Sequence, residues 1–143
     1  MKSYTDIEQS KILSEIIPLE SADMCYKCIG EDPYDVCLRP YSEWREEYKG
    51  LLIAKEVDVI PCWSLAALLD VLQIYTIPTA FSTNISVPSL TKNKNGYSIT
   101  YVGDYRIMES NNNDIESPIE IVADNPVDVC YKLVLKLHEL KML

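Results

Sequence analysis

The sequence predicts an α+β fold: an antiparallel β-meander of three to four strands packed against N-terminal, central and C-terminal helices. Three observations predict this class. Apolar residues recur at helical spacing near both ends and in the middle of the chain, alternating residues flank two turn signals, and 48% of the 143 residues are hydrophobic. The length and composition are typical of a single globular domain over residues 1–143.

The first helix is expected at about residues 6–17. Thr5 and Glu8 have the spacing of a capping box, in which two side chains satisfy free N–H groups at a helix start. Pro18 is expected to end the helix, because proline has no N–H to donate to the helical ladder. Apolar residues recur at helical spacing between these signals: Ile12, Leu13, Ile16 and Ile17.

The sequence of residues 30–60 indicates one further helix and one further strand. A short helix is expected over Ser42–Tyr48, with Ser42 as its cap and Gly50 as its stop. A strand is expected within Leu51–Ile60, where valines alternate with Asp58.

The central helix is expected over Cys62–Leu72. Pro61 comes directly before it, and proline is common near the start of a helix. Because its apolar residues nearly surround the helix, we expect it to be deeply buried. Four leucines form one stripe: Leu65, Leu68, Leu69 and Leu72.

The meander is expected after this helix. Asn95-Gly96 is a strong hairpin signal between strands at Ile85–Lys92 and Tyr97–Val102, since tight primed turns need positive φ at both central residues. Pro88 predicts that the first of these strands lies at an edge of the sheet.

A second turn, Gly103-Asp104, is expected to lead into a strand at Tyr105–Glu109, and Ile119–Val122 is a further candidate strand. The last helix is expected at about residues 126–141, capped by Asp124 or Asn125. Its apolar stripe contains four residues at helical spacing: Val127, Cys130, Val134 and Leu137.

The charge of the chain limits its partners. The formal net charge is −9, and residues 1–60 hold 13 acidic against 7 basic residues. A protein that grips phosphate backbones needs the opposite balance, so no nucleic-acid partner is expected. The N-terminus lacks the apolar run of a secretory signal, and the longest nearly apolar run, Trp63–Leu72, is too short to cross a bilayer. We therefore expect a cytoplasmic protein without a membrane segment.

The five cysteines are an odd number, which is typical of reduced thiols inside a cell. Cys25 and Cys28 have CxxC spacing, and Cys37 follows nine residues later, so the three are candidate zinc ligands. The alternatives are a redox motif and thiols that only pack in the structure; a redox CxxC should follow an apolar strand, whereas polar residues precede this one.

Cys62 is the candidate catalytic nucleophile, because at a helix start the N–H groups and the helix dipole would stabilise its thiolate. A cysteine hydrolase also needs a general base, and His138 is the single histidine. The alternative is that Cys62 is a small core residue and that His138 lies at the surface near a helix end.

The candidate binding surface combines the acidic first half of the chain with aromatic residues that we expect to be exposed. Tyrosine and tryptophan are enriched at interface hot spots, and the acidic excess favours a basic partner. The alternative is a solvated acidic surface that keeps the protein soluble. The candidate binding residues are Tyr34, Tyr41, Trp44, Glu46 and Glu47.

Three segments resemble a family of small uncharacterised proteins that is common in gut Bacteroidetes genomes, often within prophages or other mobile elements. They are YTDIEQSKILSEIIPLESADM (Tyr4–Met24), IPCWSLAALLDVL (Ile60–Leu72) and ADNPVDVCYKLVLKLHELKML (Ala123–Leu143). The resemblance implies a compact α+β domain of bacterial or phage origin, and it implies no catalytic residues.

The sequence favours a non-enzymatic accessory or protein-interaction domain with an unidentified protein partner. The alternative is a small-ligand or zinc-binding domain, or a small cysteine-dependent enzyme.

Overall fold

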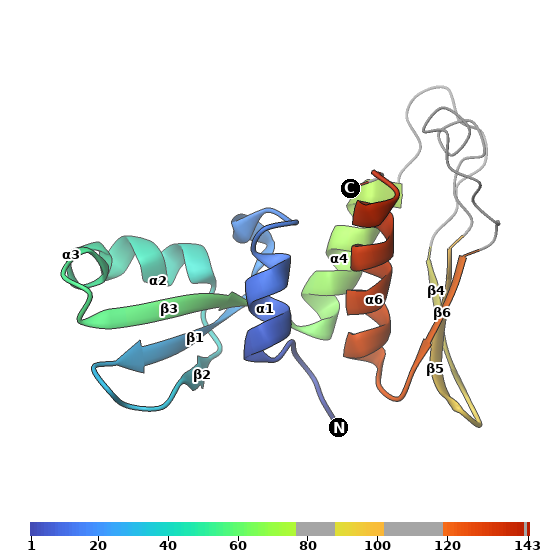
Figure 1. Ribbon diagram of the computed structural model, residues 1–143, viewed down its shortest axis with the longest axis horizontal. Helices are drawn as coiled ribbons and strands as arrows, with labels where there is room; N and C mark the ends of the chain where they lie inside the picture. Colours follow the sequence, from blue (N-terminus) through green and yellow to red (C-terminus); the bar gives the residue numbers. More distant parts are fainter. Residues whose placement is uncertain (77–87, 102–118, 142) are drawn as a thin grey trace. The chain divides into compact units, whose positions relative to one another are not determined.

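The computed structural model describes residues 1–76, 88–101, 119–141 and 143 (Figure 1). The chain has a mixed α+β fold, as predicted, with helices and two three-stranded antiparallel sheets in the described residues. It divides into two compact units: Ser3–Ala67, and Leu68–Leu143 together with Met1–Lys2. Each unit has its own sheet, and the two are described in turn.

The sheet of the Ser3–Ala67 unit contains β1 (Met24–Ile29), β2 (Asp35–Cys37) and β3 (Val57–Cys62) in the order β2-β1-β3. Both pairings are antiparallel, and the register places Cys25 opposite Cys37 on one side and opposite Pro61 on the other. Pro61 is tolerated because β3 is an edge strand, where a missing N–H need not break the ladder.

Side chains pack on both faces of this sheet, and in Figure 1 helices lie along one face and beside one end of the strands. On one face, side chains of β1 and β3 pack with residues from α1 (Ile7–Leu13) and from the segment before it. On the other face they pack with α2 (Tyr41–Glu47) and α3 (Lys49–Ile53). Alternate strand residues therefore belong to two buried clusters, one on each face of the sheet.

Helix α1 is shorter than the predicted helix at residues 6–17, and its cap is Asp6 rather than Thr5. The Asp6 carboxylate accepts the Gln9 N–H at 2.9 Å, while the Gln9 side chain accepts the Asp6 N–H at 3.3 Å. After the last helical residue the chain turns, and Pro18 precedes a short 3-10 helix, η1 (Leu19–Ser21). The prediction was wrong because Asp6 offers the same capping chemistry one residue later.

Thr5 is instead fully buried, where it ties the N-terminal segment to the end of β3. Its hydroxyl accepts the Trp63 N–H at 3.2 Å and lies 2.7 Å from the hydroxyl of Ser10. Its carbonyl accepts the Tyr26 hydroxyl at 2.7 Å. These bonds satisfy polar groups that would be costly to bury alone.

The predicted short helix at Ser42–Tyr48 is present, but Pro40 precedes its first residue and Gly50 does not stop it. The backbone bends at Tyr48, and α3 then contains Gly50. A second helix forms here because its Leu52 packs against the buried cluster beneath α2. The strand predicted within Leu51–Ile60 accordingly begins only at Val57.

The central helix, α4 (Leu65–Thr76), begins three residues later than predicted, since Pro61 and Cys62 belong to β3. Ser64 starts the helix: its hydroxyl accepts the Ala67 N–H at 3.2 Å, and Asp23 accepts the Ser64 N–H at 2.9 Å. Leu68 and Leu72 of the predicted stripe are fully buried, whereas Leu65 and Leu69 are only half-buried, so the helix is less deeply buried than predicted. The boundary between the two units falls within this helix.

The sheet of the second unit contains β4 (Ser89–Asn93), β5 (Gly96–Tyr101) and β6 (Ile119–Ala123) in the order β4-β5-β6. Strand β4 lies at an edge among the described strands, as Pro88 predicts. It begins at Ser89, after the proline, whereas the strand was predicted from Ile85; residues 85–87 lie outside the described residues. The candidate strand at Ile119–Val122 is present and pairs with β5. The predicted turn at Gly103-Asp104 and strand at Tyr105–Glu109 lie outside the described residues.

Helix α6 (Pro126–Glu139) packs on β5 and β6, and its N-cap is Asn125, which accepts the Asp128 N–H at 2.9 Å. The predicted apolar stripe is buried in full. The terminal segment is held here as well, because the Lys2 ammonium lies 2.8 Å from the Asp128 carboxylate.

The hairpin between β4 and β5 turns one residue earlier than predicted. Asn93 pairs with Gly96, so Lys94 and Asn95 form the turn, and the Asn93 side chain accepts the Asn95 N–H at 2.9 Å. Gly96 has a φ of 123° and starts β5, where an added Cβ would lie 2.6 Å from the carbonyl oxygen of Ala123. Glycine is thus required at the strand start rather than in the turn.

Replacing Gly96 by alanine is expected to lower the free energy of unfolding by about 1–3 kcal/mol, through backbone strain and overlap with β6. Denaturant titration followed by circular dichroism measures this loss. The matched control is Gly50→Ala, because a Cβ there meets no atom within 4 Å and the residue is helical. A loss of stability in the control equal to that in Gly96→Ala would contradict the prediction.

Candidate functional site

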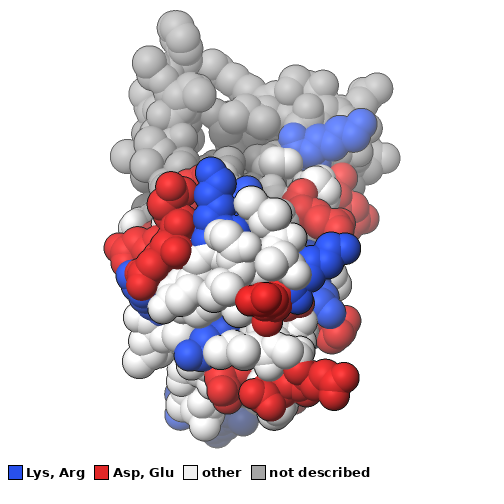
Figure 2. Space-filling model, turned by 90° about the vertical axis from the view of Figure 1, so that its left-hand side faces the viewer, with Lys and Arg blue, Asp and Glu red and all other residues white. Residues whose placement is uncertain are grey.

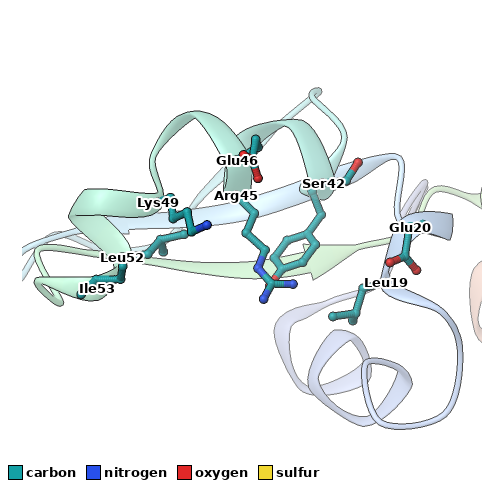
Figure 3. A pocket seen from close by; sticks show the side chains of 9 residues that line it. Leu19, Glu20, Ser42, Arg45, Glu46, Lys49, Leu52 and Ile53 are labelled. Atoms are coloured by element: carbon teal, nitrogen blue, oxygen red, sulfur yellow. The ribbon is translucent and has the colours of Figure 1, made fainter.

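A groove lies in the Ser3–Ala67 unit between η1 on one side and α2 and α3 on the other (Figure 3). Its volume is about 490 Å³, which is within the range of ligand-binding sites in proteins. The apolar part of the lining comes from Leu19, Leu52 and Ile53, and Tyr41 and Ser42 lie at the start of α2. Four charged residues complete the lining: Glu20, Arg45, Glu46 and Lys49.

The two cations of the groove, Arg45 and Lys49, come from successive helical turns. Figure 3 shows Arg45 extending from α2 toward Leu19 across the groove. Within the residues that the structure describes, neither cation forms an ion pair. Arg39, by contrast, pairs with Glu47 and lies 3.6 Å from Glu43. The groove therefore offers two positive charges that form no ion pair with a described carboxylate, although Glu20 and Glu46 line the same groove.

Exposed apolar residues continue from the groove around the end of α3. Ile53 is 76% exposed and Leu51 is 39% exposed. Ile29, at the end of β1, lies at the same end of the unit. Its neighbour Gly30 donates its backbone N–H to the Glu56 carbonyl, and the Glu56 N–H donates to the Leu51 carbonyl. We call Ile29, Leu51 and Ile53 the α3 patch. In Figure 2 acidic and basic residues surround a central area of uncharged residues at this end.

The structure brings two of the five predicted binding residues, Tyr41 and Glu46, to the groove. Trp44 was expected to be exposed, and this is wrong: it is 5% exposed and stacks on Tyr48 with ring centroids 4.0 Å apart. The spacing of Tyr41, Trp44 and Tyr48 is that of one helix face, and that face lies on the sheet.

The other two predicted binding residues are engaged elsewhere. Glu47 forms the ion pair with Arg39. Tyr34 packs on the opposite face of the sheet and donates its hydroxyl to Asp58, a hydrogen bond that raises the pKa of Tyr34 to about 12. The five residues are therefore not one surface.

Sequence reasoning missed the residues that give the groove its character, namely Arg45, Lys49, Leu52 and Ile53. The signal that predicts them is their spacing: Lys49 follows Arg45 by four residues and Leu52 follows it by seven. Residues at this spacing lie on one face of a helix. This signal was hidden because Gly50 was expected to end the helix.

The candidate zinc ligands are divided between the two faces of β1. Successive strand residues point to opposite faces, so Cys25 faces α2 while Cys28 faces the other way and donates its thiol to the Asp32 carbonyl at 2.7 Å. Cys37 lies opposite Cys25. The CxxC spacing suits one metal ion on a turn, but in this strand it separates the two sulfurs. Within the described residues no three His, Cys, Asp or Glu side chains gather into a metal-binding group.

Cys62 was expected at a helix start, and the structure places it at the end of β3 instead. The side chain is fully buried, and burial raises the pKa of the Cys62 thiol, against the opposing hydrogen bonds of Thr5 and Ser10. This environment suits a packed thiol rather than a ready thiolate. His138 is exposed on α6, in the second unit.

Comparisons with protein-family models, curated proteins and solved structures find no match to this chain. In the described part of the chain, no helix combines the length and the apolar composition needed to cross a bilayer.

Proposed function

We propose that this chain is a non-enzymatic protein-interaction module that holds a partner protein in the groove beside α2 and α3. The observation that carries the proposal is the position of Arg45 and Lys49, without an ion pair among the described residues, next to the exposed α3 patch. An apolar anchor beside a charged rim is the usual anatomy of a protein interface.

The lining also indicates the chemistry of the partner. Arg45 and Lys49 favour a carboxylate, whereas Glu20 and Glu46 in the same groove disfavour a run of negative charges. A partner segment with an apolar side chain and one neighbouring acidic residue fits both requirements. A nucleic-acid strand does not, because its phosphates would meet the two glutamates and the acidic surface.

The proposal extends to the setting of the protein. We place it in the bacterial cytoplasm and in a mobile or prophage element, as an accessory protein. The support is the odd number of cysteines, which is typical of thiols inside a cell, and the resemblance of three segments to a family common in such DNA.

The experiment is affinity capture from bacterial lysate with the immobilised full chain, followed by measurement of the dissociation constant for the captured protein. Ile53→Asp should weaken binding at least tenfold, because it removes the anchor from an interface hot spot. The matched control is Leu38→Asp: Leu38 is 84% exposed and does not line the groove, so this change should leave the affinity within about twofold.

A charge pair of variants separates the electrostatic part of the proposal. Arg45→Glu should weaken binding of the same partner by about tenfold or more, whereas Lys11→Glu, a reversal of equal size on the exposed side of α1, should have little effect. Equal losses in both variants would mean that overall charge, and not the groove, binds the partner. Capture that neither Ile53→Asp nor Arg45→Glu weakens would refute the proposed site.

A further inference from the structure

Two cysteines face each other across the β1–β2 pairing. The antiparallel register sets Cys25 directly opposite Cys37. Directly opposed residues in antiparallel strands have Cα atoms about 4.5–5.5 Å apart, and disulfides bridge Cα separations of about 4.4–6.8 Å. The expected separation of the Cys25 and Cys37 Cα atoms therefore allows a disulfide to form without a movement of the backbone.

The side chains of this pair also point to the same side of the sheet. Cys25 belongs to the buried cluster beneath α2, and Cys37 packs against that cluster. Burial raises the pKa of the Cys25 thiol to about 12, and the neighbouring Cys37 thiol adds to this rise. Cys25 is fully buried, whereas Cys37 is half-buried and is the one that a small reagent reaches from solvent.

The fold separates this pair from the remaining cysteines. Cys28 lies on the opposite face of β1, and Cys62 packs in the cluster on that opposite face of the sheet. Cys130 is buried in α6 of the second unit. Among the five cysteines, the strand register thus brings one specific pair together.

We propose that Cys25 and Cys37 are an oxidation site, which a peroxide converts into a cross-strand disulfide. The Cys37 thiolate attacks one peroxide oxygen, the O–O bond breaks, and Cys37 becomes a sulfenic acid while hydroxide leaves and is protonated to water. The Cys25 sulfur, losing its proton, then attacks the Cys37 sulfur and expels the sulfenic oxygen as a second water. Two thiols lose two electrons, and one peroxide is reduced to two waters.

The disulfide would fasten β2 to β1 directly beneath the helix that follows β2. Since β2 is only three residues long and has one neighbour in the sheet, it is the strand of this unit with the fewest backbone bonds to hold it. The inference is independent of the proposed function, because it rests on strand register alone and not on a partner in the groove.

The test treats the reduced, folded full chain with a small excess of hydrogen peroxide and then alkylates the remaining thiols under denaturing conditions. The expected product has lost about 2 Da before alkylation and accepts two fewer alkyl groups. Combined digestion at lysines and aspartates places Cys25, Cys28 and Cys37 on separate peptides, and the linked pair should contain Cys25 and Cys37.

Three variants assign the bond. Cys28→Ser should still form the disulfide and show the 2 Da decrease in mass, whereas Cys37→Ser should form no disulfide. Circular dichroism should show an unchanged fold for Cys37→Ser, because Cys37 is only half-buried. Cys25→Ser should also form no disulfide, and oxidation of Cys37 in that variant should stop at a sulfenic or sulfinic acid. A disulfide that includes Cys28, or oxidation of wild-type Cys37 to sulfinic acid without a cross-link, would overturn the inference.

Discussion

Replacing Trp63 by alanine is expected to lower the free energy of unfolding by about 3–5 kcal/mol, enough to unfold much of a marginally stable chain. Trp63 is 0% exposed and is the largest fully buried side chain among the described residues. Its indole N–H donates to the Ser21 hydroxyl at 2.9 Å, and its backbone N–H and carbonyl both bond to Thr5. The substitution leaves a cavity where the N-terminal segment, η1 and β3 meet.

Urea titration followed by the fluorescence of the remaining tryptophan, Trp44, measures the loss. Trp63→Phe is the matched control: it keeps an aromatic ring in the core but removes part of the indole and the bond to Ser21, so its cost should be smaller, about 1–2 kcal/mol. If Trp63→Ala were no more destabilising than Trp63→Phe, the packing of this residue would not be what stabilises the unit.

Replacing Leu133 by alanine is expected to cost about 2–5 kcal/mol. Leu133 is 0% exposed on α6, the helix that packs on β5 and β6. The matched control is Lys132→Ala, the exposed preceding residue, which should change stability by less than about 0.5 kcal/mol. Unfolding followed by circular dichroism provides the measurement.

The same variant tests whether the chain unfolds as the single domain that its length predicts. Both tryptophans, Trp44 and Trp63, belong to the Ser3–Ala67 unit, so their fluorescence reports on that unit alone. In a single cooperative domain, Leu133→Ala shifts the fluorescence midpoint together with the circular dichroism midpoint. A fluorescence transition that stays in place while circular dichroism shifts would show two independently folding units and contradict that prediction.

The elements that the sequence predicts best are those whose signals are local. Helix α6 has a side-chain cap, a proline in its first turn and one apolar stripe, and each of these lies within the helix or beside it. The edge position of β4 follows from Pro88 in the same way. Strands β1 and β2 were missed because side chains pack on both faces of their sheet, so burial there does not follow a simple alternation.

The boundaries went wrong where two local signals compete. Thr5 and Asp6 are both good helix caps, and Thr5 is withdrawn into the core by its bonds to Trp63 and Ser10. Cys62 follows Pro61, and a proline followed by apolar residues is typical of a helix start. Pairing with β1 nevertheless keeps both Pro61 and Cys62 in a strand. In each case a contact with a residue distant in sequence selects between alternatives that are locally similar.

The candidate site shows the same division. Tyr41 and Glu46 were recognised from their residue types, but whether an aromatic residue is exposed depends on which helix face meets the sheet, and Trp44 lies on the buried one. Arg45 and Lys49 matter because no described carboxylate pairs with them, which only the positions of all the charged side chains can show.

The α+β class, the capped amphipathic helices and the acidic balance of residues 1–60 follow from the sequence alone, because each depends on residue type and on spacings of a few residues. Tertiary structure alone decided which cysteine meets which. Cys25 and Cys28 are close in sequence, yet the strand turns them to opposite faces, and the register sets Cys25 against Cys37. Register depends on how separate segments pair, and a shift of one residue reverses the face of every side chain, so spacing along the chain cannot determine it.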